Sequence, residues 1–581
     1  MIARALKHEG VNQVFALSGG HLDPIFQSCV DHNIRVIDVR HEAAAAHAAD
    51  GYARATGKPG VAIVTAGPGV TNALTGVANA FMDAVPMICI GGRAPIRDED
   101  RLPLQGMDQV ALMEPITKLA RTVVHPERIP EYMAMAFRYA RSGRPGPVFL
   151  DVPIDVLFTP AEESTVPQIE HYAPEGRPAP SAESIDAALD ILERADRPVI
   201  FAGGGAWFAG AQGELRAFAE LARIPVFANS KARGLVPESS DLGYGGFGLS
   251  ASPLAVGAGG GPPDVVLMLG ARVGMFTGSS GGSTSLIPDT ATLIQIDIEP
   301  EEIGRCRDVQ LGLVGDVREA LRMMLDRSRG RSFADHERWI AALVAARDAA
   351  RKTHEPAMFR SETPIHQARL AREIASVVGP DGIIVADGGE TSIWMGDQAV
   401  IDSGGRWLSH GYLGCLGVGI PFGIAAKVAH PDRRVLVISG DGSIGLNFAE
   451  FDTLVRHDIP VVVVVNNDHG WGMIRHGQVR AYGEDRVVGA ELGPVRYDLA
   501  AAGFGAYAEL VTEGSGVRGA LERAFASGKP ACLNVMTDPT LPIWPTVRRA
   551  KQAPRVEQER EEPEDEVELP YYGTRKLGSR S

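Results

Sequence analysis

Three segments of this 581-residue chain repeat one pattern, in which a short apolar run ends at a polar or glycine residue and an amphipathic stretch follows. Residues 435–440, VLVISG, and residues 461–465, VVVVV, are examples of such runs. Strands of a parallel sheet are buried on both faces and are joined by helices, which produces this pattern. We therefore expect an α/β protein with three doubly wound parallel-sheet domains.

Changes in composition divide the chain. A Pro-rich stretch at 159–181 and a charged helical stretch at 331–356 are typical of linkers. Residues 539–581 are rich in Pro and charge, which leaves two alternatives, a disordered tail and a C-terminal extension that closes over an active site as a lid. The expected domains are residues 1–158, 182–330 and 361–538.

The overall charge and the cysteines limit the function classes. With 57 basic and 72 acidic residues the net charge is −15, which argues against a broad nucleic-acid-binding face. The longest apolar runs are far shorter than the ~20 residues that a membrane helix needs. The five cysteines have no C-x-x-C spacing, so neither a zinc site nor a disulfide framework is predicted. We expect a cytoplasmic protein that binds neither nucleic acid nor membrane.

Two polar motifs in the third segment, GDGS and NN, predict a phosphate-binding site with a metal. GDGS at 440–443 lies where a strand ends and a helix begins, and free amides at a helix N-terminus bind phosphate. Asp441 would repel a diphosphate unless a cation lay between them. Asn467 ends the next apolar run 26 positions later, a distance that allows one helical crossover to a parallel neighbour. Mg²⁺ prefers such oxygen ligands. The alternative without a ligand is that Asp441 caps the following helix and the Asn-Asn pair begins a turn.

The combination of GDGS with NN resembles the thiamine-diphosphate-binding motif of the acetolactate synthase and decarboxylase superfamily. The resemblance implies that Asp441, Asn467 and the main-chain carbonyl of His469 bind Mg²⁺. Residues 40–61, RHEAAAAHAADGYARATGKPGV, resemble the family's RHE…GYAR signature. There Glu42 would hydrogen-bond N1′ of the aminopyrimidine, so that the imino tautomer takes the C2 proton. The plain alternative for Glu42 is a surface carboxylate at a helix start.

Other stretches resemble the same family. AGPGVTN at 66–72 and NAFMDAVPMICIGG at 79–92 match its pyrimidine-binding domain, and ADGGETSIW at 386–394 matches its diphosphate loop. HGYLGCLGVGIP at 410–421 is similar to its GGLGxMGxGLP element, in which Leu416 would take the place of the bulky residue that bends the cofactor. The implied cofactor contacts are Pro68, Asn72, Gly389, Glu390, Thr391, Gly414, Leu416, Gly440, Asp441, Gly442, Ser443 and Asn467.

In this family the pyrimidine-binding and diphosphate-binding units of one site come from different subunits. The resemblance therefore implies a homodimer or homotetramer with shared sites. The central unit binds a nucleotide in several relatives, and Gly204, Arg272 and Asp297 are the candidate contacts for ADP, which we favour over FAD. From the residues alone, an alternative without a nucleotide explains the sequence equally well: Gly204 lies in a tight strand-to-helix turn and Asp297 is an ordinary turn residue.

The substrate class depends on finer differences. Residues 101–118, RLPLQGMDQVALMEPITK, keep the catalytic candidate Gln105 of the acetolactate synthase AFQE element, but Gly106 replaces its Glu. That departure weakens the acetolactate synthase reading. The same superfamily includes oxalyl-CoA decarboxylase and the 2-hydroxyacyl-CoA lyases, in which a C-terminal segment folds across the entrance. Arg575 and Lys576 in the tail would then contact CoA phosphates.

Glu491 follows the Asn-Asn run in a segment that is mobile in relatives. It would transfer a proton to or from the substrate hydroxyl, and the alternative is a solvated loop acid. We expect a lyase that cleaves a small-molecule acyl-CoA substrate, a 2-hydroxyacyl-CoA, to formyl-CoA and an aldehyde or ketone. The alternatives are an acetolactate synthase, a 2-keto-acid or oxalyl-CoA decarboxylase, and an inactive nucleotide-binding regulatory subunit. Intact Glu42, Asp441 and Asn467 argue against the last.

Overall fold

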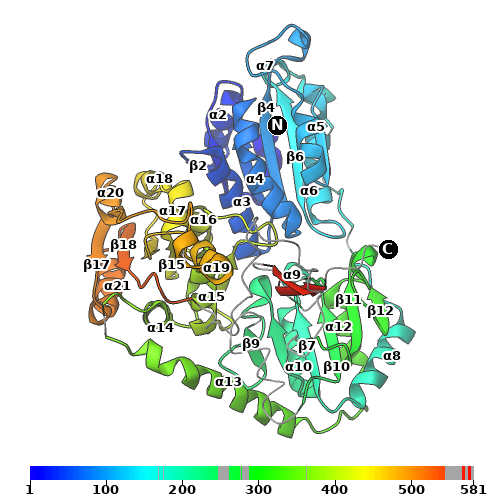
Figure 1. The fold of residues 1–581 in the computed structure, drawn as a ribbon. Coiled ribbons are helices and arrows are strands. Elements are labelled where there is room, and N and C mark those ends of the chain that lie inside the picture. The colour runs from blue at the N-terminus through cyan, green and yellow to red at the C-terminus, as the bar shows by residue number, and fades with distance from the viewer. Residues whose placement is uncertain are drawn as a thin grey trace, which may run out of the picture.

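The computed structural model contains three six-stranded parallel sheets, each in its own α/β domain. Figure 1 shows the first domain at the top, the third domain at the left and the central domain below. The expected fold class is confirmed. The structure describes residues 1–167, 169, 171–174, 176–245, 261–274, 277, 287–361, 363–542, 566–569 and 573–576.

The first domain has the strand order β2-β1-β3-β4-β6-β5. Helices α3 and α4 share one buried apolar cluster and α1, α2 and α6 share another, so both faces of the sheet are covered. Its strands are β1 (Gln13–Leu17), β2 (Arg35–Asp38), β3 (Gly60–Val64), β4 (Met87–Arg93), β5 (Leu119–Thr122) and β6 (Pro147–Pro153). Its helices are α1 (Ile2–His8), α2 (Asp23–Asp31), α3 (Glu42–Thr56), α4 (Pro68–Met82), α5 (Gln109–Met113), α6 (Ile129–Arg141) and α7 (Ile154–Phe158).

The central domain has the order β12-β11-β10-β7-β8-β9. Its strands are β7 (Pro198–Ala202), β8 (Val226–Ala228), β9 (Gly243–Gly245), β10 (Val265–Leu269), β11 (Thr292–Asp297) and β12 (Leu311–Val314). Its helices are α8 (Ala182–Glu193), α9 (Gly204–Phe208), α10 (Gln212–Ala222) and α12 (Val317–Arg327). The expected helical linker is α13 (Glu337–Met358), whose Trp339 and Leu343 join the buried cluster on one face of this sheet. The first part of α13 therefore belongs to the central core.

The third domain has the order β14-β13-β15-β16-β18-β17. Its strands are β13 (Ile383–Asp387), β14 (Arg406–Ser409), β15 (Val435–Gly440), β16 (Val462–Asn467), β17 (Tyr507–Val511) and β18 (Ala531–Met536). Its helices are α14 (Gln367–Val378), α15 (Gly389–Gln398), α16 (Gly419–Ala429), α17 (Asp441–Ile444), α18 (Glu450–Arg456), α19 (Gly472–Tyr482), α20 (Tyr497–Gly503) and α21 (Val517–Ala526).

The tail contains an antiparallel strand pair, β19 (Glu566–Leu569) with β20 (Gly573–Lys576), which the sequence analysis did not predict. The backbones of Arg575 and Lys576 lie in β20, but their side chains, like most of the proposed lid, fall outside the described residues. The CoA contacts and the lid stay predictions. Among the described helices, none is long and apolar enough to cross a membrane.

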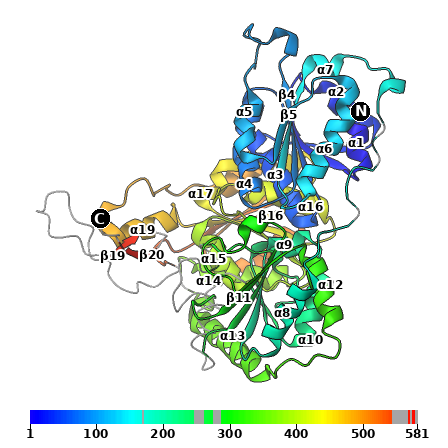
Figure 2. The ribbon, with the colours of Figure 1, turned by 90° about the vertical axis from the view of Figure 1, so that its right-hand side faces the viewer.

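Helix α3 joins the first domain to the third, because one buried cluster contains residues of α3, α4 and α16 (Figure 2). Two glycines allow this close packing. A Cβ atom at Gly51 would lie 2.8 Å from the Phe422 ring and 3.0 Å from its Cα, and one at Gly76 would lie 2.5 Å from the Ala46 Cβ. Contacts this short leave no room for a methyl group. The glycine of the GYAR sequence is thus required by helix packing around α3.

Candidate active site

The GDGS and NN motifs of the third domain lie at one edge of its sheet. Strands β15 and β16 are parallel neighbours, and Gly440 is opposite Asn466 in their register. Asp441 and Asn467 come directly after these paired positions. The expected crossover between neighbouring strands is therefore confirmed.

Asp441 carries a buried carboxylate with an unused oxygen. Its Oδ1 atom accepts the main-chain N–H of Gly442 at 3.0 Å, whereas Oδ2 is buried and has no hydrogen-bond partner in the described part of the chain. Tyr497 donates its hydroxyl to the Asp441 carbonyl at 2.9 Å. Burial and the nearby Asp468 carboxylate raise the pKa of Asp441 to about 8. A cation beside Oδ2 would give this oxygen a partner and would offset the repulsion between the Asp441 and Asp468 carboxylates.

Asn467 and His469 add neutral oxygens to the same loop. The Asn467 amide nitrogen donates to the carbonyl of Val495 at 3.1 Å and to Asn534 Oδ1 at 3.0 Å, which sets the orientation of the amide. Its Oδ1 atom accepts the His469 N–H at 3.2 Å. His469 has a left-handed backbone with φ 62°. As predicted ligands, Asp441, Asn467 and the His469 carbonyl would supply an all-oxygen donor set of the kind that Mg²⁺ prefers.

The predicted diphosphate contacts also come together at this edge. The Thr391 hydroxyl accepts the amide N–H of Asn466 at 2.8 Å, and a Cβ atom at Gly440 would lie 3.4 Å from the same hydroxyl. A Cβ atom at Gly388 would lie 3.1 Å from the Ser443 hydroxyl. A Cβ atom at Gly442 would lie 2.5 Å from the Trp471 ring. The glycines thus keep the backbone of two helix N-termini, α15 and α17, close together.

A loop between β14 and α16 carries Gly414 and Leu416. Asp387, at the end of β13, is buried and accepts the N–H of Gly417 at 3.2 Å and of Gly419 at 3.0 Å. Burial raises the pKa of Asp387. The sequence analysis did not single out this residue, although it lies inside the ADGG stretch. It fixes the end of the loop that follows Leu416.

The first domain gathers its own set of predicted residues. Glu42 is the first residue of α3, is 6% exposed, and accepts the amide N–H of Asn72 at 2.9 Å. Asn72 and Pro68 both lie on α4. A Cβ atom at Gly67 would lie 2.9 Å from the Gln105 Cβ, and the buried Oε1 atom of Gln105 has no partner among the described residues. Glu42, Pro68, Asn72 and Gln105 therefore lie on neighbouring segments of the first domain, as the predicted pyrimidine half-site requires.

Glu450 was missed by the sequence analysis. This carboxylate of the third domain accepts the main-chain N–H groups of Arg40 at 3.0 Å and His41 at 3.2 Å, directly before Glu42. Burial raises its pKa to about 7. Its only sequence signal is an acidic residue a few positions after GDGS, which is common at helix starts.

The matches to protein-family models cover all three domains. Residues 1–112 match the thiamine pyrophosphate enzyme N-terminal TPP binding domain, residues 185–324 the central domain, and residues 387–535 the C-terminal TPP binding domain. The chain belongs to the thiamine pyrophosphate enzyme family. The enzyme is thus dependent on thiamine diphosphate (ThDP), as the motifs implied.

Its relatives include named acetolactate synthases. A "Probable acetolactate synthase" of Mycobacterium bovis and the "Acetolactate synthase large subunit IlvG" of Mycobacterium tuberculosis are each 37% identical over 546 residues, 93% of this chain and 96% of the relative. A "Probable acetolactate synthase large subunit" of Methanocaldococcus jannaschii is 33% identical over 564 residues, 94% of this chain and 93% of the relative.

The predicted diphosphate half-site of this ThDP enzyme contains an ion pair that the sequence analysis did not predict. His476 Nδ1 lies 2.9 Å and 3.0 Å from the two carboxylate oxygens of Glu390, and its Nε2 lies 2.9 Å from the Pro539 carbonyl. Burial lowers the pKa of His476, but the hydrogen bond to Glu390 and the charge of that carboxylate outweigh burial. The pKa of His476 is therefore raised overall. A protonated His476 offsets the charge of Glu390 where a diphosphate would bind.

The residues present fit ThDP with a metal ion. The unpartnered Asp441 Oδ2 could bind a cation, the glycine-lined helix N-termini suit a diphosphate, and Glu42 is a buried carboxylate in a separate domain. Within its own domain the Glu42 carboxylate accepts a hydrogen bond from Asn72.

Glu491 lies beside the metal-binding loop. It forms an isolated antiparallel bridge with Gly470, and the adjacent Leu492 N–H donates to the His469 carbonyl at 2.9 Å. The side chain of Glu491 is exposed. Its proposed role in proton transfer stays a prediction.

The central-domain candidates have contacts of their own. A Cβ atom at Gly204 would lie 2.3 Å from Lys231 Cε, and Arg272 donates to the Met82 carbonyl at 2.7 Å. Asp297 is buried at the end of β11 and accepts the Glu299 N–H at 3.0 Å; burial raises its pKa to about 6. The assignment of these residues to ADP stays a prediction.

Proposed function

We propose that this chain is an acetolactate synthase-type enzyme, which transfers the acyl group of a 2-keto acid such as pyruvate to a second keto acid with release of CO₂. The observation that carries the proposal is 37% identity over 93% of the chain to a named acetolactate synthase, together with both intact half-sites. When bound, ThDP supplies a thiazolium carbon that adds to a carbonyl and accepts the electron pair left by CO₂.

Glu42 would hold the aminopyrimidine in its proton-transfer form. Because Asn72 donates to Glu42 Oε2, the other oxygen, Oε1, is left to hydrogen-bond the pyrimidine N1′. Glu42 is 6% exposed, so this hydrogen bond would be shielded from water. Gln105, with its unpartnered Oε1, would orient the substrate above the cofactor.

Asp441, Asn467 and His469 would hold Mg²⁺ against the diphosphate. Asp441 Oδ2 is the charged ligand, and the Asn467 Oδ1 and His469 carbonyl oxygens are neutral ones. The Thr391 and Ser443 hydroxyls and the main-chain amides of the two helix starts would bind the phosphate oxygens. Leu416 would place apolar bulk beneath the cofactor so that its two rings approach each other.

A second copy of the chain would complete each site, in a homodimer or homotetramer. This part of the proposal rests on the resemblance of the Glu42 and Asp441 motifs to a family in which the two halves of one site come from different subunits. Mixing Glu42→Gln and Asp441→Asn proteins tests it after subunit exchange. If sites are shared, mixed dimers have one intact site of two, and about a quarter of the wild-type activity returns. If each chain holds its own site, no activity returns.

A 2-hydroxyacyl-CoA lyase is the second candidate, and one observation argues against a complete acetolactate synthase motif. A Cβ atom at Gly106 would lie 2.7 Å from Pro103 Cγ and 3.0 Å from the Pro103 carbonyl oxygen, so this backbone has no room for the Glu of the AFQE element. On this candidate the substrate is an acyl-CoA, Glu491 moves a proton at the substrate hydroxyl, the central domain binds ADP, and the tail closes over CoA.

A substrate comparison separates the candidates. The purified enzyme with ThDP and Mg²⁺ is incubated with pyruvate or with a 2-hydroxyacyl-CoA, and acetolactate, formyl-CoA and the aldehyde are quantified. We expect consumption of pyruvate with formation of acetolactate. Cleavage of the acyl-CoA alone would replace this proposal by the lyase. Turnover of neither, together with no ThDP binding, would indicate the inactive regulatory subunit. The Glu42→Gln protein is the control and should turn over neither substrate.

A further inference from the structure

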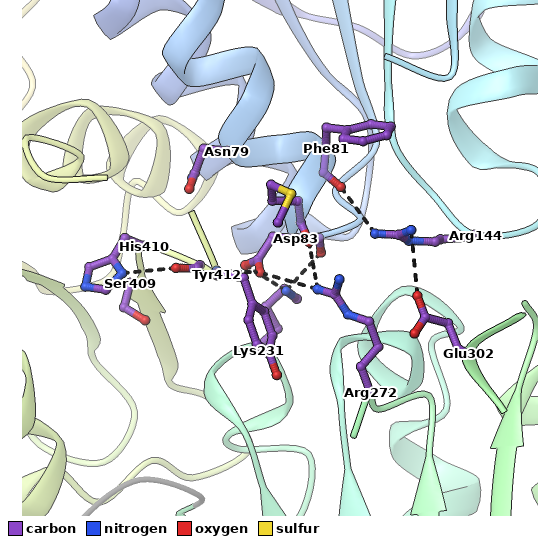
Figure 3. Close-up of polar contacts among 12 residues, drawn as sticks. Asn79, Phe81, Asp83, Arg144, Lys231, Arg272, Glu302, Ser409, His410 and Tyr412 are labelled. Carbon is purple, nitrogen blue, oxygen red and sulfur yellow. Dashed lines mark hydrogen bonds and ion pairs between the residues drawn. The ribbon is translucent and has the colours of Figure 1, made fainter. Parts of the chain in front are cut away.

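The C-terminal end of α4 is bound by cations from two domains. The carbonyl of Phe81 accepts from Arg144 at 3.4 Å, that of Met82 from Arg272 at 2.7 Å, and that of Asp83 from Lys231 at 3.0 Å. The last carbonyls of a helix carry partial negative charge, which cations stabilise. Figure 3 shows Lys231 and Arg272 of the central domain reaching this helix end. The three cations bind three successive carbonyls.

The Asp83 carboxylate is the point where these contacts meet. It is 5% exposed, and its Oδ2 atom lies 2.6 Å from Arg54 Nη1 and 2.9 Å from Lys231 Nζ. Burial acts to raise the pKa of Asp83, but Lys231 and Arg54 outweigh it and hold this pKa well below its usual range. Arg272 is 3.9 Å from Oδ1 and its guanidinium lies over the Tyr412 ring, 4.6 Å from the centroid. A buried carboxylate in this position stays charged.

The same carboxylate contacts the loop that carries Gly414 and Leu416. Asp83 Oδ1 accepts the main-chain N–H of Tyr412 at 3.2 Å. A Cβ atom at Gly411 would lie 2.0 Å from the Asp83 Cγ, so only glycine lets the loop backbone approach this closely. The carboxylate is therefore seated directly against the loop backbone.

A second side chain of the first domain fixes the start of this loop. Arg54, which pairs with Asp83, donates to the Ser409 carbonyl at 3.3 Å. The Ser409 and Ser230 hydroxyls lie 2.9 Å apart, which adds a contact from the central domain. Asp387 fixes the far end through Gly417. The residues between these anchors include the ones assigned to the cofactor.

We propose that Asp83 is a positioning residue for the cofactor loop, residues 409–417. The central domain holds Asp83, and through it the loop, in place with Lys231 and Arg272. The inference rests on the proposed roles of Gly414 and Leu416. It gives the central domain a part in cofactor binding that does not require a nucleotide. Loss of the Asp83 charge would leave Arg54 with Asp50 alone, would remove the carboxylate that pairs with the buried Lys231, and would loosen the Tyr412 side of the loop.

Three variants test the proposal. Asp83→Asn keeps the shape of the side chain and removes its charge. Lys231→Met removes one cation and leaves the Arg54 pair, so it tests the proposal even if Asp83→Asn does not fold. Lys118→Met is the matched control, because Lys118 is another partly buried lysine whose pKa burial lowers to about 8 and which donates hydrogen bonds to the Tyr139 and Ser142 carbonyls.

The first measurement is amide hydrogen exchange of peptides spanning 409–417 in protein without cofactor. We expect faster exchange in Asp83→Asn and in Lys231→Met, and wild-type exchange in Lys118→Met. The second is the ThDP dissociation constant at saturating Mg²⁺, which should rise about tenfold in the first two variants, or about 1.4 kcal/mol. It should not change in the control.

Three results would overturn the proposal. Unchanged loop exchange in Lys231→Met shows that the central domain does not hold the loop. Faster exchange with an unchanged ThDP dissociation constant shows that the loop is not positioned for the cofactor. An equal effect in Lys118→Met indicates general destabilisation. Absence of ThDP binding to the wild-type protein would refute the proposed function instead, and the exchange experiment separates the two because it uses no cofactor.

Discussion

The main-chain N–H of His41 donates to the Glu450 carboxylate at 3.2 Å, although the two residues lie 409 positions apart in the chain. Arg40 makes the same contact at 3.0 Å. The third domain therefore fixes the backbone immediately before Glu42, the residue assigned to the cofactor pyrimidine. This contact links the start of α18 to the start of α3.

This contact predicts a dependence of stability on pH. Burial raises the pKa of Glu450 from 4.5 to about 7, so the folded protein holds a proton that the unfolded chain releases between these values. The contribution of Glu450 is full below pH 4.5 and is lost as the pH rises to about 7, by up to about 3 kcal/mol. The free energy of unfolding of wild type minus that of Glu450→Gln, from urea titrations across this range, should fall with pH. A flat difference would contradict the account.

Glu42→Gln should abolish turnover while leaving cofactor binding almost intact. Gln keeps the hydrogen-bonding shape but cannot favour the imino tautomer, so kcat should fall at least about 100-fold. The diphosphate contacts of the third domain are untouched, so the ThDP dissociation constant should change little. Steady-state kinetics and calorimetry measure the two quantities separately. Full activity in this variant would exclude Glu42 from the chemistry.

Gly51→Ala should destabilise the junction of α3 with α16. The added methyl group would meet the Phe422 ring at 2.8 Å, and overpacking of a buried contact costs about 1–3 kcal/mol. Gly213→Ala on α10 is the matched control, because a Cβ atom there meets nothing within 4 Å. The control should match wild type or gain up to about 1 kcal/mol. Equal urea midpoints for the two variants would show that α3 and α16 tolerate a wider spacing.

Glu491→Gln tests the proposed proton transfer at the substrate. On the lyase candidate, the change should lower kcat for a 2-hydroxyacyl-CoA by about 10- to 100-fold and, because the side chain is exposed, leave the unfolding midpoint unchanged. Unchanged turnover with either substrate class would remove Glu491 from the mechanism.

The sequence predicts contacts that follow from neighbouring strands, and it misses contacts between distant segments. The spacing of Asp441 and Asn467 implied adjacent parallel strands, and Gly440 is indeed opposite Asn466. The Glu390–His476 pair joins residues 86 positions apart, and neither residue carries a local pattern that names the other. Such a pair depends on how two helices are placed and not on the sequence around either residue.

The same limit applies between domains. Asp83 lies in a stretch that the sequence analysis matched to the pyrimidine-binding domain, yet its partners Lys231 and Tyr412 come from the other two domains. Arg272 was a candidate contact for ADP, and the structure places its guanidinium over the Tyr412 ring and against the Met82 carbonyl. The domain arrangement decides these contacts, and the sequence pattern of a single domain does not contain it.

The most direct test of the central claim is calorimetric titration of the protein with ThDP in the presence of Mg²⁺, compared with Asp441→Asn. The substitution keeps both polar atoms but removes the charge of the only carboxylate among the proposed metal ligands. We expect one ThDP bound per chain in the wild type, binding that is lost when Mg²⁺ is chelated, and at least about a 100-fold weaker dissociation constant in the variant. Equal ThDP affinity in both proteins, with and without Mg²⁺, would contradict the proposed metal clamp.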